Sequence, residues 1–195
     1  MSAHAQFRLS EEEYLEIERK SEFRHQFYDG VMYAMSGGSP AHAFIIMALG
    51  SELRNAFKKR PCQVAGSDLR VRVSRGGLYT YPDVVVICGD LEFADKRKDT
   101  LVNPTFLIEV LSPSTEAHDR GFKTEQYRQI ESLREYALVS QSRPHVEVYR
   151  PQPDAGWQFS EFTGLDATCR FESVECSIPL AEIYDKIEFE ATPPF

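Results

Sequence analysis

Two acidic residues stand in stretches of the sequence that are otherwise apolar. Asp83 precedes the run Val84-Val85-Val86-Ile87-Cys88, and Glu109 interrupts the apolar run of residues 106–111. Burial of an ionised carboxylate is costly unless a cation or a hydrogen-bond donor compensates its charge. Two convergent carboxylates suit Mg²⁺, which keeps several waters and takes only one or two protein carboxylates. We therefore expect the two carboxylates within a few ångströms of each other, at neighbouring strand ends, as a metal or catalytic site.

A structural role for the same residues is the alternative. Asp83 could cap a loop, and Glu109 could pair with Arg70, Arg72 or Lys123, because each of these partners would neutralise the buried charge. The sequence favours a functional site, since perturbed carboxylates in apolar surroundings are typical of such sites, and leaves the structural role open.

The two runs themselves are rich in β-branched and apolar residues, which is typical of central strands covered on both faces. Capping, turn and periodicity signals predict the elements around them. These are a helix over residues 11–19 capped by Ser10, a hairpin with strands 24–28 and 31–35 around Asp29-Gly30, a long helix that begins at Ser39-Pro40, strands over 63–65 and 69–73, a helix over 118–130, strands over 135–139 and 146–149, and a short helix after Pro179.

The composition is ordinary for one well-packed core: 195 residues, of which 42% are hydrophobic and 27% charged. We expect a single domain over residues 1–195. The chain shows no signal-peptide pattern and no apolar run that could span a bilayer, so we expect a cytoplasmic protein without a membrane partner. Cys62, Cys88, Cys169 and Cys176 form no C-x-x-C pair. They are expected to be reduced, ordinary residues rather than disulfides or metal ligands.

The formal net charge of −8 is unfavourable for a polyanionic partner. Short basic stretches do occur at residues 58–60 and 96–98 and between residues 70 and 75. A cluster of carboxylates also lowers the total charge at the place where a divalent cation would restore it. The charge therefore argues only weakly against nucleic acid and does not exclude a metal-dependent nuclease.

A series of segments resembles the PD-(D/E)XK nuclease superfamily. Pro82-Asp83, followed after a gap by Glu109-Val110-Leu111, carries the general likeness, and the chain is closer still to the Uma family of restriction endonucleases within it. The segments of this closer likeness are 24–30 (RHQFYDG), 35–42 (MSGGSPAH), 67–71 (SDLRV), 81–86 (YPDVVV), 108–115 (IEVLSPST), 119–123 (DRGFK) and 179–184 (PLAEIY). The dipeptide alone is a weak signal, whereas these segments in this order are specific and extend over nearly the whole chain.

The resemblance implies a restriction-endonuclease-like fold, which is an α/β three-layer core with a mixed central sheet flanked by helices. It implies that Asp83 and Glu109 hold a divalent cation, Mg²⁺ or Mn²⁺, with help from the backbone carbonyl of Val110. Leu111 occupies the position of the superfamily's lysine, so the amine would come from Lys123 in the following helix.

The spacing around Lys123 fits that role. Asp119, Lys123 and Tyr127 stand at i, i+4 and i+8, so they share one helix face that could point toward the strand ends. The alternative is a solvated helix lysine that pairs with Asp119.

Three further positions bear on the site. Gln26 stands where members of the family carry Glu, and an amide can bind a cation or hold a water but supplies no charge and cannot act as a base. His42 could face the site, although a capping or core role is an equal alternative. Asp68 could orient Arg70 or approach the site, and we assign it no function.

These features predict an Mg²⁺-dependent endodeoxyribonuclease that cleaves phosphodiester bonds with an activated water. Asp83, Glu109, Lys123 and Gln26 would form its catalytic set, and DNA would be its partner. One alternative is a nuclease-fold protein that binds nucleic acid or a protein partner without cleavage. Another is a structural subunit of an oligomer.

We also expect a homodimer, because nucleases of this fold often cut as pairs. The apolar C-terminal segment with Phe189 and Pro193-Pro194-Phe195 could cover a neighbouring chain.

Overall fold

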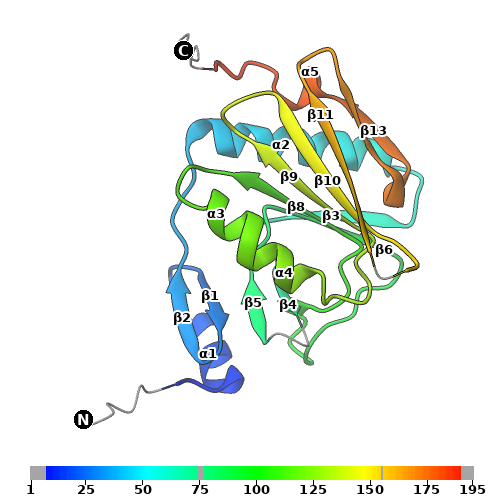
Figure 1. Cartoon of the computed structure of the whole chain (residues 1–195). Coiled ribbons are helices and arrows are strands. Elements are labelled where there is room, and N and C mark those ends of the chain that lie inside the picture. The colour runs from blue at the N-terminus through cyan, green and yellow to red at the C-terminus, as the bar shows by residue number, and fades with distance from the viewer. Residues whose placement is uncertain (1–7, 74–76, 155, 190–195) are drawn as a thin grey trace.

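The protein is described here by a computed structural model that covers residues 8–73, 77–154 and 156–189. Its centre is a six-stranded sheet in the order β11-β10-β9-β8-β6-β3 (Figure 1). β8 and β9 run parallel, and the other neighbours are antiparallel, so the sheet is mixed as predicted. The strands are β3 (Cys62–Gly66), β6 (Val84–Cys88), β8 (Phe106–Leu111), β9 (Glu135–Ser140), β10 (His145–Pro151) and β11 (Trp157–Thr163).

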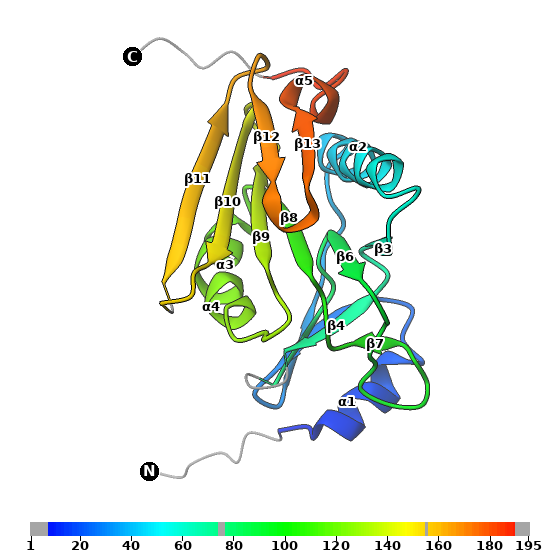
Figure 2. The same cartoon turned by 90° about the vertical axis from the view of Figure 1, so that its right-hand side faces the viewer.

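Helical layers cover both faces of this sheet (Figure 2). On one face lie α2 (Pro40–Ala56), α5 (Leu180–Ile183), the 3₁₀ turn η2 (Glu172–Val174) and a small ribbon of β12 (Thr168–Phe171) and β13 (Cys176–Pro179). On the other lie α3 (Glu116–His118), the π-helical turn η1 (Asp119–Lys123) and α4 (Thr124–Tyr127). The three-layer α/β class expected from the sequence is therefore confirmed.

Strand alternation divides the core into two clusters. Along β6, Val84 and Val86 pack toward α2, whereas Val85 and Ile87 pack toward α4. Successive side chains of a strand point to opposite faces, so residues of one parity in a strand share a layer. This alternation fixes the layer toward which each acidic residue in these strands points.

A second sheet has the order β2-β1-β5-β4-β7. Its strands are β1 (His25–Tyr28), β2 (Val31–Ala34), β4 (Arg70–Val73), β5 (Leu78–Thr80) and β7 (Thr100–Leu101). The helix α1 (Glu11–Glu18) packs on it through Tyr14, which stacks on Phe27 with ring centroids 4.6 Å apart. The turn between β1 and β2 has φ of 47° at Asp29 and 80° at Gly30, as the predicted two-residue hairpin requires.

Local signals locate several elements well. Ser10 and Glu13 form the predicted capping box, with the Ser10 amide donating to the Glu13 carboxylate over 2.8 Å. Ser39 caps α2 through a bond from the amide of His42. The helix expected over residues 118–130 begins earlier, at Glu116, and ends at Tyr127 with a π-helical turn in its middle.

The expectation of unlinked cysteines is wrong for Cys62 and Cys88, which form a disulfide. The antiparallel register of β3 and β6 places the two residues directly opposite each other, although 26 positions separate them in the sequence. Sequence spacing could not show this pairing, because it follows from strand register. Cys169 and Cys176 are buried free thiols, as expected.

In the C-terminal segment, Phe189 packs on its own chain, with its ring centroid 5.5 Å from that of Tyr184. That the segment covers a neighbouring chain stays a prediction. Pro193, Pro194 and Phe195 lie outside the described residues. Within the described part of the chain, every helix falls short of the length and hydrophobicity that a membrane crossing requires.

Candidate active site

Asp83 lies against the strand that carries Glu109. In the antiparallel pairing of β6 and β8, Val84 is opposite Ile108, so the preceding residue, Asp83, lies beside Glu109. The Asp83 Oδ2 atom accepts a hydrogen bond from the amide of Val110 over 2.8 Å. Glu109 shares the parity of Leu107 and Leu111 and faces the α4 layer. The Asp83 carboxylate is close enough to contribute to the raised pKa of Glu109, and it is also contacted from α2, on the other face of the sheet.

Glu109 is buried and meets side chains from the helical segment above it. Lys123 Nζ lies 3.1 Å from Glu109 Oε1, and the Tyr127 hydroxyl donates to the same oxygen over 2.6 Å. Lys123 Nζ is also 2.9 Å from Asp119 Oδ1. Glu109, Asp119 and Lys123 are each less than one-tenth exposed. Lys123 is therefore a buried ion-pair residue and not a solvated helix lysine.

Burial changes the protonation behaviour of this cluster. It raises the pKa of Glu109, and the nearby Lys123 ammonium only partly opposes that shift. Burial would lower the pKa of Lys123, but the carboxylates of Glu109 and Asp119 outweigh it and raise this pKa overall. Lys123 accordingly keeps its charge, and Glu109 is the group whose ionised form is short of compensation.

The π-helical turn η1 positions the two helix residues of the cluster. The amide of Thr124 reaches back to the carbonyl of Asp119, five residues earlier, and the Thr124 hydroxyl donates to the same carbonyl over 2.8 Å. π-turns inside α-helices are rare and occur frequently at functional sites. This turn keeps Asp119 and Lys123 together above β8, which agrees with the helix face that their spacing predicted.

His42 reaches the same place from α2. Its Nε2 atom is 3.3 Å from Asp83 Oδ2. The hydrogen bond to Asp83 raises the pKa of His42 against the opposing effect of burial, and the backbone of Val110 contributes in the same direction. Of the roles open to His42 in the sequence, the structure supports one beside the acidic pair.

A cleft of about 620 Å³ opens next to Lys123 and Asp119. Gln26 lines it, with its Nε2 atom 3.2 Å from Nε2 of His118. Burial lowers the pKa of His118, and the Lys123 ammonium adds to this effect. The other lining residues are Tyr28, Tyr33, Ala34, Met35, Ser36, Ser114, Thr115 and Phe122. Gln26 thus contacts the wall of the cleft, and among the described residues it forms no hydrogen bond to Asp83 or Glu109.

The other proposed partners of Glu109 are engaged elsewhere. Arg70 binds Thr100, Tyr81 and Asp99, and Arg72 binds Glu11. Asp68 neither orients Arg70 nor approaches the site, because its side chain is 98% exposed and pairs with Arg24. The sequence could not distinguish these alternatives, since the strands that carry Arg70 and Glu109 belong to different sheets.

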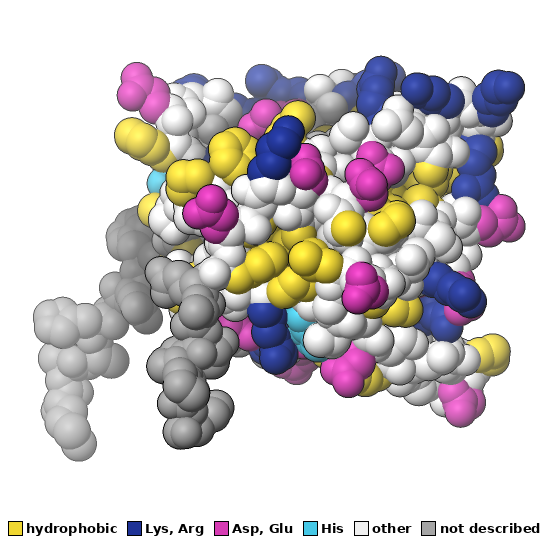
Figure 3. All heavy atoms as spheres, turned by 90° about the horizontal axis from the view of Figure 1, so that it is seen from above, with side chains coloured by type: hydrophobic (Ala, Val, Ile, Leu, Met, Phe, Trp, Pro, Cys, Tyr) yellow, Lys and Arg dark blue, Asp and Glu magenta, His cyan; other side chains and the backbone are white. Residues whose placement is uncertain are grey.

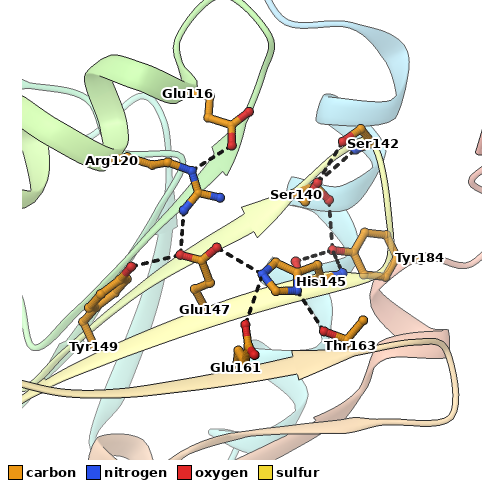
Figure 4. Close-up of polar contacts among 10 residues, drawn as sticks. All are labelled: Glu116, Arg120, Ser140, Ser142, His145, Glu147, Tyr149, Glu161, Thr163 and Tyr184. Carbon is orange, nitrogen blue, oxygen red and sulfur yellow. Dashed lines mark hydrogen bonds and ion pairs between the residues drawn. The ribbon is translucent and has the colours of Figure 1, made fainter. Parts of the chain in front are cut away.

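A second buried polar network lies on the same side of the six-stranded sheet (Figure 4). Arg120, the residue after Asp119, donates to Glu147 Oε2 on β10 over 2.6 Å, and the Tyr149 hydroxyl donates to the same oxygen over 2.9 Å. His145 Nε2 is 3.0 Å from Glu147 Oε1. Sequence reasoning missed this network, because its members come from separate elements and carry no motif.

The oxygen atoms near Asp83 suit a hard divalent cation. Two carboxylates with a neighbouring backbone carbonyl match the preference of Mg²⁺ and Mn²⁺ for oxygen ligands. The shortage of positive charge around buried Glu109 is of the kind that a cation would relieve. Within the described residues, no three His, Cys, Asp or Glu side chains converge as a metal-binding group, so waters would complete the coordination.

Comparisons with known proteins bear on this geometry. Residues 11–180 match the model of the Uma2 family, described as "Putative restriction endonuclease". Two proteins of Synechocystis sp. are similar over most of their lengths. "Uncharacterized protein slr1290" is 34% identical over 93% of this chain and 94% of its own, and "Uncharacterized protein sll1609" is 31% identical over 84% and 92%.

A solved structure shares the fold. It is a protein of Anabaena variabilis described as "a putative nuclease belonging to DUF820". It superposes with a TM-score of 0.72 at 19% identity, and the match covers 89% of this chain and 96% of the other. At this identity the likeness concerns the fold alone.

Proposed function

From the premise that the chain belongs to the Uma2 family, we propose that it is a metal-dependent endonuclease that hydrolyses phosphodiester bonds in DNA. One observation carries the proposal. The buried carboxylate of Glu109 lies beside Asp83 on the neighbouring strand and within 3.1 Å of the buried Lys123 ammonium, next to an open cleft. A charged cluster of this kind is expensive to bury and is typical of catalytic sites.

In this mechanism Asp83 and Glu109, with the carbonyl of Val110, would hold Mg²⁺ or Mn²⁺. When bound, the cation would polarise the scissile phosphate and lower the pKa of a water. The Tyr127 hydroxyl holds Glu109 Oε1 in place, and Asp119 holds the ammonium of Lys123. Lys123 would stabilise negative charge that develops on the phosphate or would orient the water.

Gln26 has a different place in this proposal from the one its sequence position suggested. Its amide contacts His118 in the lining of the cleft, so it would hold a water or a substrate group there rather than act as a base. His42, which contacts Asp83, would orient that carboxylate.

The alternative is a nuclease-fold protein that binds without cleavage. The Lys123 ammonium, which pairs with Glu109 over 3.1 Å and so neutralises part of its charge, is the observation that favours it. Titration calorimetry with Mg²⁺ or Mn²⁺ separates the two proposals, because a protein that only binds its partner need not bind a divalent cation.

The direct test is cleavage of single-stranded and double-stranded DNA by the wild type and by Asp83→Ala, with Mg²⁺, with Mn²⁺ and with a chelator. We expect metal-dependent cleavage that the substitution abolishes. Asp68→Ala is the matched control, because this exposed carboxylate lies away from the site. Cleavage that survives both the chelator and Asp83→Ala would refute the proposal.

A homodimer and a cytoplasmic location complete the proposal. Light scattering at micromolar concentration tests the first, since a mass of 22.3 kDa would identify a monomer. Cell fractionation tests the second.

A further inference from the structure

The cleft beside Lys123 is rich in aromatic rings. Tyr28 and Phe122 meet edge to face with ring centroids 4.7 Å apart, and the rings of Phe122 and His118 stack at 5.0 Å. These three residues form an aromatic cluster in the lining of the cleft. Tyr33, on the edge strand β2, adds a fourth ring that is 51% exposed.

The cleft has few charges that could follow a phosphate backbone. Among its lining residues, Lys123 is the one lysine or arginine, and it is already held by Glu109 and Asp119. Proteins that bind duplex DNA through its backbone do so with many lysine and arginine contacts. On the face shown in Figure 3, most Lys and Arg side chains lie along the upper and right-hand edges, and acidic and apolar side chains are interspersed over the middle of the described surface.

Exposed aromatic side chains suit a different part of a nucleic acid, the bases. An unstacked base exposes a π-face that stacks on aromatic side chains with little dependence on sequence. The volume of about 620 Å³ lies within the range of pockets for small organic ligands. Gln26, Ser36 and Ser114 add polar groups along the same walls that could meet the edge of a base.

We propose that this cleft takes one unstacked nucleobase of the substrate, adjacent to the phosphate that is cleaved. The inference rests on the proposed nuclease function and narrows it, because the base must come from a single strand or from a nucleotide flipped out of a duplex. Tyr33 is then a substrate-binding residue, and Lys123, which lines the cleft beside Glu109, marks the position of the scissile phosphate.

The test measures binding without cleavage. Asp83→Ala protein is titrated with a fluorescent single-stranded oligonucleotide, with the matched duplex, and with a duplex that carries one mismatched pair. The reporter is 2-aminopurine, whose emission changes when it stacks. We expect the single strand to bind more tightly than the matched duplex. A mismatched duplex that binds like the single strand identifies flipping as a second source of the base, whereas binding of the single strand alone excludes flipping.

Substitutions in the cleft locate the bound base. Tyr33→Ala should weaken single-strand binding by about 5- to 150-fold, the equivalent of one lost stacking contact, and Tyr33→Trp should restore it. Ala34→Trp, at an exposed position on the same strand, should also weaken binding because it fills the cleft. Phe159→Ala is the matched control, since Phe159 is 50% exposed on β11 and lies outside the cleft.

The inference is overturned if no oligonucleotide binds, if the matched duplex binds as tightly as the single strand, or if Tyr33→Ala behaves like Phe159→Ala. Failure of the nuclease proposal gives a different result. In that case wild-type protein would cleave nothing with Mg²⁺ or Mn²⁺, while single-strand binding would still depend on Tyr33.

Discussion

Glu109 and Glu147 make an informative comparison within one sheet. Both are buried, they lie on β8 and β10 with β9 between them, and each is contacted by a cation from the same π-helical turn. Glu147 has donors on both carboxylate oxygens: Arg120 and Tyr149 on Oε2 and His145 on Oε1 (Figure 4). In Glu109, Oε1 accepts a hydrogen bond from the Tyr127 hydroxyl and forms an ion pair with Lys123. Its Oε2 atom has no hydrogen-bond partner among the described residues.

The two carboxyl groups differ accordingly in pKa. Burial acts to raise both. In Glu147 the hydrogen bonds from Arg120, Tyr149 and His145 outweigh it and lower the pKa, whereas burial prevails in Glu109 and raises the pKa. Burial of a charged group therefore does not by itself identify a site. Incomplete compensation of that charge, next to an open cleft, is the feature that separates Glu109 from Glu147.

The largest effects are expected from the two cations. Lys123→Ala leaves Glu109 and Asp119 facing each other, so the free energy of unfolding should fall by about 3–5 kcal/mol, the usual cost of breaking a buried pair. Cleavage by the folded fraction should slow by about 10²- to 10³-fold, and Lys123→Arg should rescue it poorly. Arg120→Ala should cost only about 1–3 kcal/mol, because Glu147 keeps its other donors.

Urea denaturation and single-turnover cleavage measure these changes. Because Lys123 is buried in an ion pair, we expect a loss of stability together with the loss of cleavage. Wild-type stability and wild-type cleavage in this variant would place Lys123 outside the site.

The paired amide substitutions compare the two glutamates directly. Glu109→Gln removes a negative charge from the site, so cleavage should fall by about 10²- to 10³-fold, by analogy with the loss of one electrostatic group from an active site. Glu147→Gln should leave the rate of the folded protein within a few-fold of wild type. Equal losses of activity in the two variants would break the comparison.

The stability of Glu147→Gln gives a smaller effect. Arg120 loses a charged partner but remains partly exposed, so the free energy of unfolding should decrease by about 1–3 kcal/mol. Thermal and urea unfolding measure the change, and Glu161→Gln, at an exposed position near His145, serves as the control. An unchanged stability would mean that the network in Figure 4 contributes little to folding.

The smallest expected effect is the opposite pH dependence of the two residues. The lowered pKa of Glu147 contributes stability above the unfolded pKa of about 4.3, and this contribution is lost as the pH falls through the folded value. Because the pKa of Glu109 is raised in the folded protein, Glu109 keeps a proton there at pH values where the unfolded chain has released it. Stability therefore decreases as the pH rises above about 4.3.

Urea unfolding of the wild type and of the two Gln variants from pH 3 to pH 9 tests these signs. The stability advantage of wild type over Glu147→Gln should grow with pH, and that over Glu109→Gln should shrink. Slopes of the same sign would contradict the comparison.

The sequence by itself determined the elements whose signals are local. The Ser10 capping box, the Asp29-Gly30 turn and the Ser39-Pro40 helix start each depend on contacts within a few residues, so they could be predicted without knowledge of the rest of the chain. The ordered segments that resemble the Uma family likewise predicted the family and the fold class, which the match over residues 11–180 and the shared fold confirm.

Only the tertiary structure decided which distant residues meet. The register of β6 and β8 joins Asp83 to Val110, and the register of β3 and β6 joins Cys62 to Cys88. The π-helical turn, the aromatic cleft and the network around Glu147 depend in the same way on packing between separate elements. Such contacts carry no local signal, because their stability comes from strand pairing and side-chain complementarity between segments far apart in the chain.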